Sequence, residues 1–163
     1  MNNVDIKKLS IISDGSFLLT AGTLDKYNTM TAGWGQLGVV WSVPVFTVYV
    51  RYNRYTFEFI ENNEYFTAAF FDNEKYSKAL SFCGSKSGRD YDKAKETGLT
   101  PIAVDGSVAF AEAKKIIVSK KIYTHDLVEE KFLDKEKFNA YYSETNPLHK
   151  VYVGEIISAY ENS

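Results

Sequence analysis

The segment from residue 84 to residue 90, Gly-Ser-Lys-Ser-Gly-Arg-Asp, carries the most informative local chemistry of the chain. Two glycines flank two hydroxyl side chains and a lysine, and a helix is predicted to begin immediately afterwards, from Arg89 to Thr97, with Gly98 as its C-terminal cap. Unpaired N–H groups and the helix dipole make a helix N-terminus suited to a phosphate monoester. The spacing is not that of a Walker A loop. The alternative is an ordinary capped helix start beside a solvated basic loop.

A second cationic group follows the clearest predicted strand, Val45 to Arg51, which is entered from a proline. Asn53 is expected to cap a helix that runs from Arg54 to about residue 62. Arginines at a strand end and at a helix start would form a two-pronged anion clamp together with Thr56, although plain surface charge is the alternative. Two such groups in one small acidic protein favour a single shared ligand that bears a phosphate.

Side chains that would catalyse a reaction unaided are not recognisable. His125 and His149 are distant in sequence from any nucleophile motif, and no GxGxxG motif follows a strand. Cys83 is the only cysteine, which excludes an intramolecular disulfide and a CxxC pair and argues against a metal site. If the protein performs redox chemistry, an organic cofactor must supply it.

Strands are expected to dominate the fold, with helices inserted between them and no strict βαβ alternation. Strands are predicted over residues 17–23, 30–34, 45–51, 65–71, 109–113, 115–123 and 151–160, a turn over 25–28, and helices over 54–62, 75–82, 89–97 and 132–142. This pattern favours a mainly β fold, a β-barrel with helical insertions, over a doubly wound sheet. The strand from Val45 to Arg51 is apolar on both faces, so it is expected to lie inside the barrel or partly under a partner subunit.

The bulk composition limits the class of protein. With 163 residues, 45% of them hydrophobic and 25% charged, the chain is expected to form one domain over residues 1–163. The net charge of -2 argues against nucleic-acid binding. The longest apolar stretch, residues 37–50, is interrupted and too short to span a membrane, and no signal peptide is recognisable, so a cytoplasmic location is expected. The 15% aromatic content suits strand packing and equally a stacking surface for a flat ligand.

Four ordered blocks resemble the flavin reductase-like family, whose fold is an FMN-binding split β-barrel, and within it the flavoredoxin branch. The blocks are NTMTAGWG at 28–35, PVFTVYVRYNRYTFEF at 44–59, CGSKSGRDYDK at 83–93 with ETGLTP at 96–101, and HKVYVGEI at 149–156. The resemblance extends over nearly the whole chain.

The resemblance implies a set of cofactor-binding residues. Those expected along the isoalloxazine, largely through their backbone, are Asn28, Met30, Thr31, Ala32 and Trp34. Those expected at the phosphate or ribityl chain from one side are Arg51, Arg54 and Thr56. Those expected to hold the phosphate from the other side are Ser85, Lys86, Ser87 and Arg89, with Asp90 and Lys93 supporting the loop. The flavin itself carries the chemistry, so no catalytic side chain and no metal are implied.

The implied function is that of an NAD(P)H-dependent flavin oxidoreductase, in which hydride passes from the nicotinamide C4 to the flavin N5. The family resemblance also implies a homodimer with the flavin near the subunit interface. Related reductases carry a Gly-Asp-His nicotinamide-binding motif where this chain has Pro147-Leu148-His149, so His149 is either a nicotinamide-binding residue or a surface histidine before a strand. The alternatives are a flavoredoxin-type electron carrier reduced by a protein partner, and a non-redox flavin-binding module.

Overall fold

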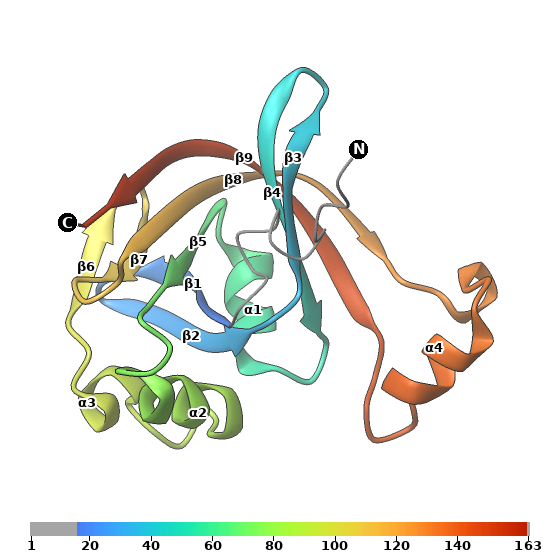
Figure 1. The fold of residues 1–163 in the computed structure, drawn as a ribbon, viewed down its shortest axis with the longest axis horizontal. Helices are drawn as coiled ribbons and strands as arrows, with labels where there is room; N and C mark the ends of the chain where they lie inside the picture. Colours follow the sequence, from blue (N-terminus) through green and yellow to red (C-terminus); the bar gives the residue numbers. More distant parts are fainter. Residues whose placement is uncertain (1–15, 163) are drawn as a thin grey trace, which may run out of the picture.

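A seven-stranded antiparallel sheet, in the order β2-β1-β5-β8-β9-β4-β3, forms the body of the molecule in a computed structural model that describes residues 16–162 (Figure 1). Its strands are β1 (Phe17–Thr23), β2 (Lys26–Ala32), β3 (Gly35–Val40), β4 (Val43–Arg51), β5 (Tyr65–Phe70), β8 (Lys115–Asp126) and β9 (His149–Glu161). A separate hairpin pairs β6 (Pro101–Val104) with β7 (Ser107–Phe110). The prediction of a mainly β fold with helical insertions is confirmed.

The helices are inserted between strands. They are α1 (Tyr55–Asn62), α2 (Ser77–Ser85), α3 (Lys93–Thr97), η2 (Glu129–Lys131) and α4 (Lys135–Tyr141). In Figure 1, α2 and α3 lie together beside β2, whereas α4 stands out from the ends of β8 and β9. We call residues 127–148, which connect these two strands and carry η2 and α4, the α4 arm.

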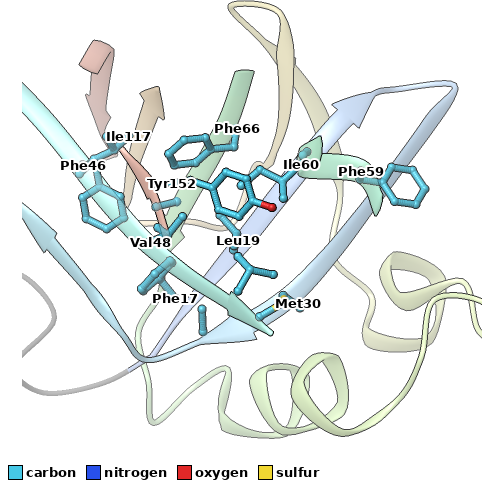
Figure 2. Close-up of a cluster of buried hydrophobic side chains, with 14 residues drawn as sticks. Phe17, Leu19, Met30, Phe46, Val48, Phe59, Ile60, Phe66, Ile117 and Tyr152 are labelled. Atoms are coloured by element: carbon cyan, nitrogen blue, oxygen red, sulfur yellow. The ribbon is translucent and has the colours of Figure 1, made fainter. Parts of the chain in front are cut away.

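The core lies on both faces of β1. Phe17 and Leu19 point into a cluster completed by β4, β5, β9 and α1, which Figure 2 shows around the fully buried Tyr152. Leu18 points the other way, into a second cluster with α2, α3 and β7. Because both faces are covered, the strand reads as a continuous apolar run rather than an alternating one. The same reasoning explains why β4 carries apolar side chains on both of its faces.

Several sequence-based boundaries were wrong, and three of them bear on the site. The turn predicted over 25–28 is confined to residues 24 and 25, because Lys26 already pairs with Thr23 as the first residue of β2. Asn53 does not cap α1, since Arg54 occupies the cap position without a side-chain hydrogen bond. The helix predicted from Arg89 begins only at Lys93, where the Asp92 carboxylate accepts from the Lys95 N–H. Gly98 does end this helix in the left-handed conformation, with φ 68°. Strands β3 and β6 were missed.

Between residues 16 and 162, every helix is too short or too polar to traverse a lipid bilayer.

Candidate functional site

A small cationic pocket opens between β2, the start of α1, the end of α2 and the loop that follows it. Its volume is about 90 Å³. The residues that line it are Asn28, Met30, Asn53, Arg54, Tyr55, Thr56, Cys83, Ser85, Lys86, Ser87, Gly88 and Lys93. Segments far apart in sequence therefore meet here, as the shared-ligand hypothesis requires.

Three cations border the cationic pocket without a carboxylate partner. The Arg54 guanidinium donates from Nη1 to the carbonyl oxygen of Gly84 at 3.1 Å. Lys93 is only 7% exposed, and its Nζ donates to the carbonyl oxygens of Thr29 and Cys83, both at 2.8 Å. Neither of these residues nor Lys86 forms an ion pair within the described chain.

The buried Lys93 ammonium is the most informative of these groups. Burial lowers the pKa of Lys93, because desolvation disfavours the charged form. Its two hydrogen bonds leave one of the three ammonium protons unused. A buried charge normally has a counter-charge, so an anionic ligand would complete this environment.

Hydroxyl donors and a close backbone approach make the pocket fit a phosphate. The Thr56 hydroxyl accepts from Asn28 Nδ2 at 2.8 Å, and the Ser87 hydroxyl accepts from the Arg89 N–H at 3.2 Å. Both hydroxyls therefore keep their own proton for another acceptor. The loop can press against Asn28 only because residue 88 is glycine: a Cβ there would lie 1.9 Å from Asn28 Oδ1. The Ser85 hydroxyl is already bonded to the carbonyl oxygen of Ser81 at 2.9 Å.

The sequence predicted helix N-termini at Arg54 and at Arg89, and the second of these is absent from the structure. The loop follows the C-terminal end of α2, where the Lys86 N–H bonds to the carbonyl oxygen of Phe82. Since α3 begins only at Lys93, no helix N-terminus stands at Arg89. The start of α1 does border the cationic pocket through Tyr55 and Thr56. The N-terminus of α1 can thus contribute helix-dipole stabilisation to an anion in this pocket.

A second pocket, of about 160 Å³, adjoins the first. We call it the aromatic pocket, and it is lined by Met30, Thr31, Ala32, Gly33, Trp34, Tyr49, Arg51, Arg54 and His149. Met30 and Arg54 line both pockets, so the two form one elongated site. The combined shape suits a ligand with an anionic end and a flat, largely apolar end.

The α4 arm packs against three side chains that line the aromatic pocket. The Trp34 ring lies 4.8 Å from the His149 ring and 5.2 Å from the Tyr141 ring, measured between centroids. The Arg51 guanidinium donates to the carbonyl oxygens of Pro147 at 2.8 Å and Tyr141 at 3.0 Å. Arg51 therefore binds the arm to the end of β4.

His149 is neutral in this environment. It is 6% exposed, and burial, together with the nearby Arg51 and Arg54 guanidiniums, lowers its pKa to about 4. The Tyr142 hydroxyl lies 3.0 Å from His149 Nδ1. The residue is thus a buried neutral imidazole at the wall of the pocket, and not an ordinary surface histidine.

Most of the residues predicted for the cofactor line one of the two pockets. Asn28 lines the cationic pocket, apart from Thr31, Ala32 and Trp34 of its predicted group, and Arg51 lines the aromatic pocket while it donates to the arm. Arg89 and Asp90 line neither pocket. The Arg89 guanidinium instead lies 4.4 Å from the Tyr55 ring centroid and pairs with Glu58, because the chain turns outward before α3.

Other lining residues were missed from the sequence. Tyr49 is two positions from Arg51 on β4, so strand alternation alone would have placed it on the same face. Cys83 was noted only for its redox class, yet it lines the cationic pocket, and burial raises the pKa of its thiol to about 11. Nothing in the sequence indicated that Tyr141 and Tyr142 contact the lining residues Trp34 and His149, because no local pattern shows where the α4 arm folds back.

We predict that the free energy of unfolding falls as the pH is lowered from 6.5 towards 4. The unfolded chain binds a proton at His149 near pH 6.5 and the folded chain only near pH 4, so the unfolded state holds more protons in this window. The loss from this residue should reach about 3 kcal/mol by pH 4, measured by urea unfolding. His149→Gln should flatten the slope, while the matched variant of the exposed His125, His125→Gln, should keep it. Equal slopes in both variants and the parent would contradict the assignment.

Comparison with known proteins identifies the family. The model of the flavin reductase like domain matches residues 9–163. Among solved structures, flavoredoxin from Methanosarcina acetivorans is 24% identical with a TM-score of 0.71, covering 91% of this chain and 68% of that one. Flavoredoxin of Desulfovibrio vulgaris (Miyazaki F) is 22% identical with a TM-score of 0.69, covering 91% and 69%. An NADH:FAD oxidoreductase of Streptomyces globisporus is 14% identical with a TM-score of 0.68, covering 91% and 75%.

The search of curated proteins found no match. The family model spans nearly the whole chain, and the similar structures share its sheet and inserted helices. The chain therefore belongs to the flavin reductase-like family and has that family's split-barrel fold.

Proposed function

We propose that the protein binds FMN along the two adjoining pockets and catalyses hydride transfer to it from NAD(P)H. The observation that carries the proposal is the pairing of a cationic pocket that lacks a counter-charge with an aromatic pocket directly beside it. A phosphate monoester joined to a flat ring system has the same two-ended chemistry. The family assignment supports the same ligand.

The cationic pocket would anchor the phosphate. Arg54 and Lys86 supply exposed positive charge, and Lys93 supplies buried positive charge. The hydroxyls of Thr56 and Ser87 add donors with a defined direction. Charge-assisted hydrogen bonds of this kind are about twice as strong as neutral ones, so the anchor fixes the position of the rest of the ligand.

The aromatic pocket would orient the ring. When bound, the flavin supplies the redox chemistry by accepting a hydride. The segment Met30 to Trp34 offers backbone groups along one wall, and Trp34 and Tyr141 restrict the access of water. Arg51 and Arg54 give this pocket a positive potential, which would stabilise negative charge on a reduced ring. No side chain here has to act as a general acid or base.

A flavoredoxin-type electron carrier is the second candidate. In that case FMN stays bound and a protein partner reduces it. The burial of His149, at 6% exposed, favours this reading, because little of the imidazole surface remains for a nicotinamide.

Steady-state oxidation of NADH and NADPH in the presence of FMN separates the two candidates. We expect turnover with at least one nicotinamide, because the aromatic pocket is open beside Trp34, which is 39% exposed. Absorbance of the reduced nicotinamide measures it, with heat-unfolded protein as the control for non-enzymatic reduction. No turnover with either nicotinamide, together with reversible reduction of the bound flavin by dithionite, would favour the carrier.

Arg54→Ala should weaken FMN binding by about 1–3 kcal/mol, because it removes a charge-assisted donor from the cationic pocket. Riboflavin, which lacks the phosphate, should lose less affinity than FMN on this substitution. Arg89→Ala is the matched control, since its guanidinium lies on Tyr55 and Glu58 outside the pocket. Titration by flavin fluorescence measures the affinity of each flavin for the parent protein and the two variants. The phosphate assignment is wrong if Arg89→Ala costs as much FMN affinity as Arg54→Ala.

We further propose that two copies of the chain associate through the β3–β4 hairpin, which projects from the body in Figure 1. β3 is an edge strand on which Leu37, Val39 and Val40 are exposed, and the turn that follows it exposes Trp41. An apolar edge of this kind is a site for association. The turn also holds Trp41 at φ 52° and Ser42 at φ 63°, where Asn and Gly are the usual residues. Trp41 is 62% exposed, although its ring meets the Tyr123 ring edge to face, so most of it is available to a second copy.

Light scattering coupled to size exclusion should give the mass of a dimer, and Val39→Asp should shift it to the monomer. Val39 is 73% exposed on β3, so a carboxylate there would be buried unpaired in the interface. Leu133→Asp is the control, because Leu133 is fully exposed on the α4 arm. A monomeric parent protein, or a dimer that tolerates Val39→Asp, would exclude this surface.

A further inference from the structure

We propose that Lys121 is a positioning residue for the flavin phosphate, because it holds the C-terminal end of α1 and so determines where Arg54 and Thr56 lie at the other end. The inference rests on the proposed function, since it concerns the phosphate site of the cationic pocket. Lys121 itself lines neither pocket. A role in ligand binding is thereby assigned to a side chain that is remote from the ligand.

The ammonium group of Lys121 binds the last turn of α1. Its Nζ donates to the carbonyl oxygen of Ile60 and, at 2.9 Å, to the carbonyl oxygen of Glu61. The last carbonyl groups of a helix have no intrahelical partner, so these bonds satisfy groups that would otherwise need water. A cation at this end of a helix is also stabilised by the helix dipole. Because Lys121 belongs to β8, the bonds join α1 to the middle of the seven-stranded sheet.

The Glu61 side chain makes a second connection from the same turn. Its carboxylate accepts from the Tyr152 hydroxyl at 2.8 Å and from Lys150 Nζ at 2.9 Å. Burial raises the pKa of Glu61, but the hydrogen bonds from Lys150 and Tyr152 outweigh burial and leave the pKa below its usual value. The carboxylate is therefore ionised at neutral pH. Tyr152 is fully buried in the cluster of Figure 2, so this connection ends in the core.

Two amide side chains complete the C-terminal end of α1. Asn62 Nδ2 donates to the carbonyl oxygen of Glu58 at 2.7 Å, and Asn63 Nδ2 donates to the carbonyl oxygen of Phe59 at 2.8 Å. Together with the bonds from Lys121, every carbonyl oxygen from residue 58 to residue 61 accepts from a side chain. This end of the helix is therefore held in one position.

The opposite end of α1 forms part of the cationic pocket. Tyr55 and Thr56, the first two residues of the helix, line the pocket, as does Arg54 directly before them. Arg54 occupies the cap position without a side-chain cap hydrogen bond, so this end is open to a ligand. A slide or rotation of α1 at its far end would displace the Arg54 guanidinium and the Thr56 hydroxyl from the phosphate position.

Direct attraction between Lys121 and the phosphate is the weaker of two effects. The eight residues of α1 separate the two groups by about 12 Å along the helix axis. This distance exceeds the screening length of about 8 Å at physiological ionic strength. The negative charge of Glu61 further offsets the positive charge of Lys121. The position of α1 is therefore the main route by which Lys121 affects the ligand.

The test compares Lys121→Met with Lys120→Met by titration of flavin fluorescence. Methionine keeps most of the apolar stem, and both variants remove one positive charge. Lys120 is the neighbouring residue of β8, and its Nζ pairs with the exposed Glu64 carboxylate at 2.9 Å. We expect Lys121→Met to weaken FMN binding about fivefold, the effect of one misplaced hydrogen bond, and riboflavin binding less than about twofold. Lys120→Met should match the parent protein with both flavins.

The ratio of FMN affinity to riboflavin affinity is a readout that a merely stabilising contact would not change, because such a contact affects both flavins alike. An equal loss for the two flavins in Lys121→Met overturns the inference. The same fall of the ratio in Lys120→Met also overturns it, since the effect would then follow from net charge.

Tyr152→Phe is the second variant, because it keeps the buried ring and removes only the hydroxyl that donates to Glu61. It should lower the same ratio, by less than Lys121→Met, and it decides the question if Lys121→Met does not fold. A parent protein that prefers FMN, with the parental ratio in Tyr152→Phe, overturns this inference alone. A parent protein that binds riboflavin as tightly as FMN removes the phosphate site of the proposed function, and this inference with it.

Discussion

The buried ammonium group of Lys93 is the interaction on which the site depends. It joins β2 to α2 by donating to the carbonyl oxygens of Thr29 and Cys83, and so fixes the distance between the two walls of the cationic pocket. No carboxylate of the described chain neutralises it. A charge taken out of water without a partner is costly, and an anion bound next to it recovers part of that cost. The buried positive charge of Lys93 therefore favours a negatively charged ligand in the cationic pocket.

The two pockets are built from different parts of the chain. The cationic pocket draws on β2, α1 and the loop after α2, all of which pack against the core. The aromatic pocket draws on β2, β4 and the first residue of β9. Met30 and Arg54 belong to both, so a ligand that spans the two pockets would contact the same two side chains from each. The position of a ligand in one pocket is therefore coupled to its position in the other through these shared side chains.

The sequence predicted the barrel well because strand runs such as Phe17–Thr23 are decided by local apolar pattern and β-branched content. The loop at 84–90 and the arginines after β4 were also recognisable, since glycines and cations at those spacings have few other uses. Where the loop after residue 85 ends and the next helix begins could not be recognised from the sequence. Lys86–Asp92 extends as a loop because Asp92, not a residue near Arg89, supplies the N-terminal cap. The role of Arg51 depended on the path of the α4 arm, a tertiary feature without a local signature.

The α4 arm lies outside the barrel's hydrogen-bonded ladder, continuous in sequence with the ends of β8 and β9 and fastened to β4 through the Arg51 side chain. Mutations that lengthen, shorten or resequence this insertion would leave the strands and the anchoring lysine untouched. The cationic pocket and the arm can therefore vary independently of each other, because they share no residue.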